Sequence, residues 1–176
     1  MQRDGVVLTT ARLRLRQLTG HDTAFLGALL NDPDFLCHIG DRGVRSETDA
    51  LGYLAAGPLA SYAQHGFGLW CCERLDTGEP IGICGVLRRE TLPHPDVGYA
   101  LLPASRGCGY AREAVIGVLN FARNVLCLPC VVAIVSPANT RSLHLLDTLG
   151  YERAEMVVMS PGADPVWLLR PRVSLS

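Results

Sequence analysis

The sequence predicts a single α+β domain, with a mixed, mostly antiparallel sheet of about seven strands flanked by about four helices. Three observations favour this fold class. A chain of 176 residues is long enough for one complete core and short for two. Hydrophobic residues make up 48% of the chain, which is typical of a compact globular protein. The hydrophobic period also changes along the chain between that of strands and that of helices. We therefore assign residues 1–176 to one domain.

The N-terminal third reads as one strand followed by two helices. Residues 13–18, LRLRQL, alternate apolar and charged side chains, as a half-buried strand does. The apolar residues of 23–32 fall on one helical face. A second helix begins at Ser46, which forms a capping-box-like pattern with Asp49. Pro58 is expected to kink or split this second helix.

The rest of the chain alternates strands with two further helices. The run 130–137 is continuously apolar, as in a strand buried on both faces. The last two strands are expected to close the sheet as an antiparallel pair. The predicted strands cover residues 67–73, 81–89, 95–103, 130–137, 152–160 and 165–171, and the predicted helices cover 110–126 and 139–151.

Charge and composition exclude several classes of partner. The formal net charge of −1 gives no electrostatic footprint for nucleic acid. The N-terminal residues lack an apolar segment of the length that a secretory signal needs, and the most apolar window, 125–135, is too short to span a bilayer. The seven cysteines are an odd number, which fits reduced thiols. We therefore expect a cytoplasmic protein without a nucleic-acid or membrane partner.

One cysteine pair suggests a metal or redox site. Cys127 and Cys130 form a C-x-x-C pattern, which zinc sites and redox motifs share. A structural zinc site needs about four ligands, and the sequence offers no second pair at a suitable spacing. The pattern favours buried structural cysteines, and we expect no metal.

A glycine-rich turn is the strongest local signal of a binding site. In YALLPASRGCGYAREA, residues 99–114, a strand ends at Pro103 and a helix follows the turn Arg106–Gly109. The free N–H groups and the dipole of a helix N-terminus favour a bound phosphate. Gly107 and Gly109 lack the β-carbons that would keep a pyrophosphate away. An ordinary tight turn or a site for another nucleotide is the alternative, and the absence of lysine excludes a P-loop.

Four blocks of the sequence resemble the GNAT superfamily of N-acetyltransferases and, more narrowly, its RimJ/RimL-like branch. The family's pyrophosphate signature, Gln/Arg-x-x-Gly-x-Gly/Ala, matches Arg106 to Ala111. LTTARLRLRQL is similar to the opening strand of the branch, and TGEPIGICG is similar to its second hairpin. NTRSLHLLDTLGY is similar to its Asn-x-x-Ser segment that ends in Leu-Gly-Phe/Tyr. Together the blocks extend from residue 8 to residue 151.

The resemblance implies a splayed sheet, a co-substrate and a set of binding residues. The fourth and fifth strands are expected to separate, with the pantetheine arm of acetyl-CoA in the gap. Backbone groups of the fourth strand would bind the pantetheine, N–H groups of the turn would bind the pyrophosphate, and Asn139 and Ser142 would line the arm up to the sulfur. The implied cofactor-binding residues are Ala100, Leu101, Leu102, Arg106, Gly107, Cys108, Gly109, Tyr110, Ala111, Arg112, Asn139 and Ser142.

The resemblance also implies a base for the amine and a donor for the leaving thiolate. Asp96 stands where relatives often carry a glutamate used as base, and a solvated strand-end carboxylate is the alternative. Glu90 and His94 are reserve candidates. Leu146 occupies the position of the tyrosine acid that many relatives have. Ser142 is therefore the candidate donor, and a helix N-cap is its alternative role.

The predicted function is direct transfer of an acetyl group from acetyl-CoA to a primary amine. For the RimJ/RimL-like branch, the resemblance implies a protein N-terminal α-amine as acceptor. A small amine, such as an amino acid, a polyamine or an aminoglycoside, is the second hypothesis. A non-catalytic acyl-CoA-binding module is the third. The sequence leaves the oligomeric state open, including a homodimer.

Overall fold

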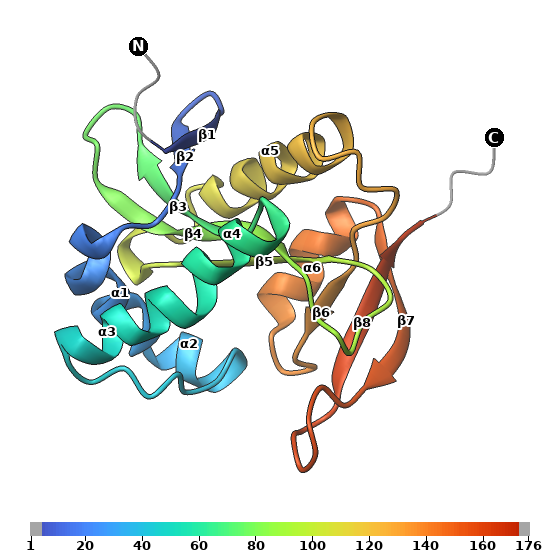
Figure 1. Ribbon diagram of the computed structural model, residues 1–176. Coiled ribbons are helices and arrows are strands. Elements are labelled where there is room, and N and C mark those ends of the chain that lie inside the picture. Colours follow the sequence, from blue (N-terminus) through green and yellow to red (C-terminus); the bar gives the residue numbers. More distant parts are fainter. Residues whose placement is uncertain (1–4, 173–176) are drawn as a thin grey trace.

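In the part of the chain that the computed structural model describes, residues 5–172, two antiparallel sheets lie side by side (Figure 1). The α+β class is confirmed, with one strand more than expected because a hairpin opens the chain. The first sheet has the order β1 (Val6–Thr9), β2 (Leu13–Arg16), β3 (Leu69–Arg74), β4 (Pro80–Leu87) and β5 (Asp96–Leu101). The second has the order β6 (Ala133–Val135), β8 (Val166–Pro171) and β7 (Tyr151–Val157).

The two sheets are joined where β5 and β6 begin. Val97 N donates to Val132 O, and Val132 N donates to Pro95 O, both at 2.9 Å. Asp96 and Val132 form an isolated parallel bridge at the same place. Beyond it β5 continues along β4 and β6 along β8, so that the two strands diverge (Figure 1). The expected splay between the fourth and fifth predicted strands is confirmed.

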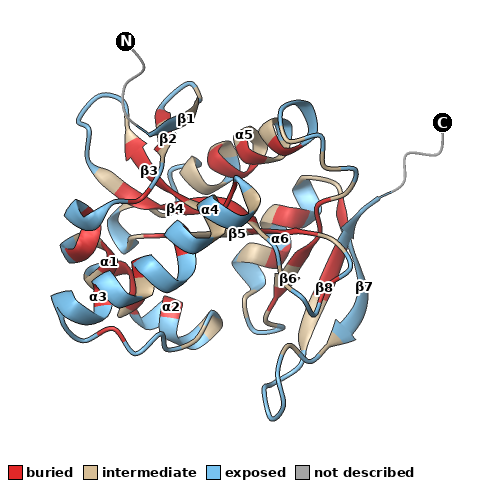
Figure 2. Ribbon diagram, in the orientation of Figure 1, coloured by how far each residue is buried: buried red, intermediate tan, exposed pale blue. Residues whose placement is uncertain are grey.

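Helices cover both faces of the first sheet. α5 packs its apolar side on one face, where Ala114, Val115, Val118 and Ala122 are fully buried. α1, α2 and α3 pack on the opposite face and form a second core, so that buried residues follow the sheet on both sides (Figure 2). Within residues 5–172 the α-helices are α1 (Thr23–Leu30), α2 (Pro33–His38), α3 (Glu47–Leu54), α4 (Ala60–His65), α5 (Tyr110–Asn124) and α6 (Thr140–Thr148).

Two features of the helical layer differ from the predicted pattern or refine it. α2 was not predicted, because six residues are too few to show a helical period. Its start is nevertheless well signalled, since Pro33 occupies the first turn and Asp32 caps the helix by accepting from Phe35 N. The kink expected at Pro58 is present as a π-helical turn, Ala55–Leu59, that separates α3 from α4.

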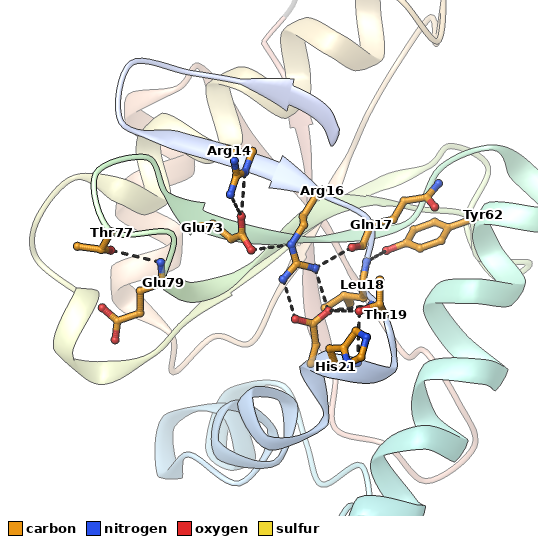
Figure 3. A network of polar contacts seen from close by, with 11 residues as sticks. Arg14, Arg16, Gln17, Leu18, Thr19, His21, Tyr62, Glu73, Thr77 and Glu79 are labelled. Atoms are coloured by element: carbon orange, nitrogen blue, oxygen red, sulfur yellow. Dashed lines mark hydrogen bonds and ion pairs between the residues drawn. The ribbon is translucent and has the colours of Figure 1, made fainter. Parts of the chain in front are cut away.

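A largely buried charge cluster fixes the start of α1 to the sheet (Figure 3). Arg14 and Arg16 of β2 both bind Glu73 of β3, each at 2.6 Å. Arg16 also binds Asp22, next to α1, at 2.8 Å. Burial raises the pKa of Asp22, but hydrogen bonds from Arg16 and Thr19 outweigh it and hold that pKa below its ordinary value. The cluster therefore holds the α1 end of the helical layer against the sheet.

The two cysteines of the C-x-x-C pattern lie in a surface loop. Cys127 is exposed, with a φ of 53° in the loop after α5, and Cys130 is half-buried, which corrects the expectation of a buried pair. The chain turns at the surface there, so the thiols are not part of a core.

No group of three or more His, Cys, Asp or Glu side chains between residues 5 and 172 could hold a metal ion. None of the helices in that range has the length and apolar character needed to cross a membrane.

Candidate active site

The turn between β5 and α5 has the backbone geometry that its glycines predict. Gly107 has a φ of 73° and Gly109 a φ of 82°, both in the left-handed region that favours glycine. Gly109 is the N-cap of α5, and no side chain caps this helix. The first N–H groups of α5 are therefore available to an anion.

The turn borders a cleft of about 690 Å³, which we call the cofactor cleft. Most residues predicted to bind the cofactor line it, but Leu102 and Cys108 do not. The N–H of Leu102 is already used, because it donates to Ile81 O at 2.8 Å. Those that line the cleft are Ala100, Leu101, Arg106, Gly107, Gly109, Tyr110, Ala111, Arg112, Asn139 and Ser142.

Strand β5 presents alternate backbone groups to the gap between the sheets. Val97 N–H points to the β6 side, and Leu102 N–H points to the β4 side. Because backbone groups alternate along a strand, those of Tyr99 and Leu101 face the gap, whereas those of Ala100 face β4. Tyr99 and Leu101 are thus better placed than Ala100 for backbone contacts with a ligand in the gap.

The side chain of Arg106 is directed to α2. Its Nε donates to Leu101 O at 3.1 Å, and its Nη1 donates to Asp34 at 2.8 Å. It also pairs with Asp32, the N-cap of α2. These carboxylates neutralise the guanidinium. The cationic side chain left beside the turn is Arg112, which makes no ion pair within residues 5–172 and lines the cofactor cleft.

Ser142 meets Tyr99 across the gap between the sheets. Asn139 is the N-cap of α6, and its Oδ1 accepts from Ser142 N at 3.2 Å. Ser142 is therefore not the helix cap, and its hydroxyl is hydrogen-bonded to that of Tyr99. Burial raises the pKa of Tyr99 to about 12, although the bond to Ser142 lowers it in part. The phenol is thus protonated at neutral pH and can donate.

Sequence reasoning missed Tyr99, because its strand position gave it no separate signal. Leu146, at the position of the family's tyrosine, is fully buried in the core. A phenol nevertheless reaches the gap, from β5 instead of α6. The available clue was a tyrosine seven residues before the arginine of the glycine turn.

Arg12, also missed from the sequence, braces the turn from the β1–β2 hairpin. Glu113 of α5 accepts from Thr10 Oγ1 at 2.6 Å and from Arg12 Nε at 2.7 Å. Arg12 Nη1 donates to Cys108 O at 3.0 Å. The guanidinium also lies 4.4 Å from the centre of the Tyr110 ring. The hairpin therefore positions the turn without lining the cleft, and its signal in the sequence was the block LTTARLRLRQL, which contains Arg12.

A second cleft, of about 940 Å³, lies against α2, α3, β5, β6 and the β7–β8 loop. We call it the acceptor cleft. Asp96 lines it, is 1% exposed, and accepts from Arg89 Nε at 2.9 Å. Burial raises the pKa of Asp96, although the positive charge of Arg89 and its hydrogen bond lower it in part. An aspartate with a raised pKa is a stronger base than an ordinary one. The structure thus excludes the alternative of a solvated carboxylate, and the role of base stays a prediction.

The reserve candidates for the base line neither cleft. Glu90 is exposed, and His94 is half-buried outside both linings. A different histidine, His38 in the last turn of α2, lines both clefts. Its Nδ1 is buried and has no hydrogen-bond partner among residues 5–172. A bound ligand would satisfy this nitrogen, and no sequence signal pointed to it because α2 itself was not predicted.

The two clefts meet at the Tyr99–Ser142 bond. Tyr99, Ala100, Asn139 and Ser142 line both of them. Ligands in the two clefts would therefore come into contact beside two hydroxyl groups and a free edge of β5.

The sequence matches the family model described as "Acetyltransferase (GNAT) domain" over residues 12–152. This chain therefore belongs to the GNAT acetyltransferases, a family of acyltransferases whose acetyl donor is acetyl-CoA.

Solved structures share the whole fold. An acetyltransferase from Agrobacterium tumefaciens str. C58 is 27% identical, with a TM-score of 0.77 over 92% of each chain. RimJ from Mycobacterium smegmatis, in complex with CoA-disulfide, is 23% identical, with a TM-score of 0.72 over 90% of this chain and 80% of that one. Spermidine N-acetyltransferase from Vibrio cholerae, in complex with CoA and spermine, is 18% identical, with a TM-score of 0.73 over 90% and 94%. The last two likenesses show the fold alone.

The cofactor cleft fits the CoA part of acetyl-CoA. A β-carbon on Gly107 would meet no atom within 4 Å, so the backbone of the turn is open on that side. The uncapped start of α5 and Arg112 suit a pyrophosphate. The N–H groups of Tyr99 and Leu101 and the C=O group of Tyr99 suit the amides of a pantetheine arm that lies in the gap as an added strand, whereas the C=O group of Leu101 already accepts from Arg106 Nε.

Proposed function

We propose that this chain transfers the acetyl group of acetyl-CoA directly to a primary amine, the α-amine of a protein N-terminus. The observation that carries the proposal is the meeting of two clefts at Tyr99 and Ser142. One cleft offers the backbone groups that suit CoA, and the other opens beside Asp96. Direct transfer needs both reactants held in contact, and this arrangement supports it.

The residues at the junction suit each part of the reaction. Acetyl-CoA supplies the acetyl group as a thioester. Gap-facing N–H groups of β5 stabilise the negative charge that develops on the thioester oxygen. Asp96 takes the proton that the ammonium loses, through a bridging water, and the nitrogen lone pair then forms the new C–N bond. The C–S bond breaks with its electron pair on sulfur. One hydroxyl of the Tyr99–Ser142 pair donates to the other, and the second donates to that sulfur. The second proton that leaves the nitrogen neutralises the thiolate, which gives the CoA thiol and the amide.

The charges of the acceptor cleft support an amine with a single positive charge. Its carboxylates are Asp96, which Arg89 already binds, and Asp164 in the β7–β8 loop. Arg42 and Arg89 line the same cleft. A polyamine needs several carboxylates and would be repelled by these guanidiniums. The RimJ/RimL-like pattern of the sequence adds support for a protein N-terminus.

The test is acetyl transfer to a panel of N-terminal peptides, amino acids, polyamines and aminoglycosides. Release of the CoA thiol and the product mass are measured together. We expect peptides to gain one acetyl group on the α-amine. Transfer to small amines alone would reject the protein N-terminus as acceptor. Thermal stabilisation by acetyl-CoA without transfer to any amine would favour the non-catalytic acyl-CoA-binding module.

A further inference from the structure

Three side chains that line the acceptor cleft, to which we refer together as its donor wall, keep hydrogen-bond donors that have no acceptor in the part of the chain that the structure describes. Arg42 lies in the loop between α2 and α3, Tyr53 lies in α3, and Arg89 follows β4. Within residues 5–172, the Arg42 guanidinium and the Tyr53 hydroxyl make no hydrogen bond, and Arg42 is exposed to solvent. Arg89 uses its Nε for Asp96, and its two terminal nitrogens are unpartnered among the same residues.

The guanidiniums of Arg42 and Arg89 act electrostatically on the Tyr53 hydroxyl. Burial raises the pKa of Tyr53, and the positive charges of Arg42 and Arg89 lower it in part. Both guanidiniums therefore lie within electrostatic reach of the Tyr53 hydroxyl. The net direction is upward, so the hydroxyl is protonated at neutral pH and acts as a donor.

The carboxylates of the acceptor cleft do not neutralise the donor wall. Asp96 already forms an ion pair with Arg89. Asp164 belongs to the β7–β8 loop and forms no ion pair with Arg42 in the described part of the chain. The charge of Arg42 is therefore unbalanced. A guanidinium fork presents donors alone, and a protonated phenol adds one further donor, which together match the two oxygens of a carboxylate.

We propose that the acceptor is a primary amine that also carries a carboxylate, which Arg42, Tyr53 and the free nitrogens of Arg89 bind. This inference rests on the proposed N-acetyltransferase function and names the substrate class of the same site. Arg89 also holds Asp96, so a carboxylate bound at the donor wall places the rest of the acceptor near the predicted base. Two sources share this chemistry: a free amino acid, or a peptide with an acidic residue near its N-terminus.

The test compares amines that differ in one charge. One pair is the C-terminally amidated peptide Ser-Glu-Ala-Ala and its counterpart Ser-Gln-Ala-Ala. The other pair is 4-aminobutyrate and its amide. We expect the carboxylate member of at least one pair to have a kcat/KM at least about 10-fold higher, which is the effect of a hydrogen-bonded charge. The pair that shows the preference identifies the source.

Variants of the donor wall test the assignment to these residues. Arg42→Gln should remove the preference by raising KM for the carboxylate member, with little change for the amide member. Tyr53→Phe should do the same to a smaller extent, about 3- to 5-fold. Arg88→Gln is the matched control, because Arg88 precedes Arg89 but does not line the cleft. A second readout is the further rise in melting temperature when the preferred carboxylate amine is added to the CoA-saturated protein, which Arg42→Gln should abolish.

The outcomes separate this inference from the proposed function. An active enzyme with equal kcat/KM for both members of both pairs would overturn the carboxylate site alone. A full preference retained in Arg42→Gln would overturn it as well. A chain that is stabilised by acetyl-CoA but acetylates no amine would overturn the proposed function, and the carboxylate inference with it.

Discussion

The cofactor side and the acceptor side of this molecule are built from different parts of the chain. At the turn between β5 and α5 the groups that we propose for binding are backbone N–H groups, positioned by Gly107, Gly109 and an uncapped helix. On the acceptor side the proposed groups are side chains that line the cleft, such as Arg42 and Asp96. A backbone site restricts the sequence, because few residues tolerate its conformation. The residues of a side-chain site can differ between relatives that bind different ligands. The sequence therefore indicates the acetyl donor, acetyl-CoA, but not the amine that accepts the acetyl group.

The largest effect is expected where the backbone site is broken. Gly109→Glu forces a side chain onto a φ of 82°, places a β-carbon 3.3 Å from Arg12 Nη2, and adds a negative charge where a phosphate should bind. Acetyl-CoA at 100 times its Kd should stabilise the wild type by about 2.7 kcal/mol, and this stabilisation should vanish in the variant. Melting curves with and without acetyl-CoA measure it.

Gly78→Glu is the matched control for backbone strain. Gly78 has a φ of 72°, a β-carbon on it would meet no atom within 4 Å, and it lines neither cleft. This control should keep the full rise in melting temperature that acetyl-CoA causes in the wild type. A shift that persists in Gly109→Glu would mean that the turn is not the phosphate site.

A change on the acceptor side should slow the reaction and spare the cofactor. Asp96→Asn removes the predicted base, so kcat should fall about 100-fold. The wild-type rate should rise with pH as Asp96 loses its proton, above the ordinary aspartate range because its pKa is raised, and the variant should lack this limb. The acetyl-CoA melting shift should remain, since Asp96 does not line the cofactor cleft. An unchanged pH profile would reject Asp96 as base.

The same pKa shift has a consequence for stability. A carboxyl whose pKa is higher in the folded state than in the unfolded state binds its proton more tightly when folded. Asp96 therefore favours folding at low pH, and this contribution is lost as pH rises from the ordinary aspartate pKa through the raised one. As pH rises through this window, the melting temperature of the wild type should fall relative to that of Asp96→Asn. A constant difference would contradict the raised pKa.

Loss of the hydrogen bond between Tyr99 and Ser142, where the two clefts meet, should have a smaller effect on kcat. Tyr99→Phe removes one hydroxyl and leaves Ser142, so kcat should fall about 5-fold, as for the loss of one hydrogen bond. Ser142→Ala should act through the same pair, so the double variant should lose less than the product of the two single effects. Rapid-quench rates at saturating substrates measure this coupling. Independent effects would show that the hydroxyls do not act together.

The smallest effect is expected from the hairpin that braces the turn. Glu113→Gln removes the charge that Arg12 binds at 2.7 Å, in a pair whose arginine side chain is 47% exposed. Exposed pairs contribute about 0.2–1 kcal/mol, so the Kd for acetyl-CoA, measured by calorimetry, should rise by a factor between about 1.4 and about 5. Arg170→Gln breaks a comparable exposed pair with Glu155 in the second sheet and should leave the Kd unchanged. Equal effects would point to a general loss of stability.

The sequence predicted the fold where a pattern is long or conformationally strict. β3, β4, β5, β7 and β8 each contain three or more repeats of the two-residue strand period, and α5 contains about four helical turns. The glycine turn needs φ values that other residues rarely adopt. α2 is too short to show a period, so His38 could not be placed. The sequence also placed the backbone of Leu102 in the gap, whereas its N–H group points to β4. The side to which a backbone group points depends on how the strand pairs, and this pairing is set only in the assembled sheet.

The pairing of Arg106 explains what the first position of the family signature requires. Its Nε binds the carbonyl of Leu101, the last residue of β5, while Asp32 and Asp34 bind the rest of the guanidinium. The shared demand is a donor long enough to reach that carbonyl, which the amide of glutamine also has. In this chain the positive charge of Arg106 is matched by carboxylates of α2, so the phosphate site that we propose at the turn depends on backbone N–H groups and Arg112 and not on Arg106.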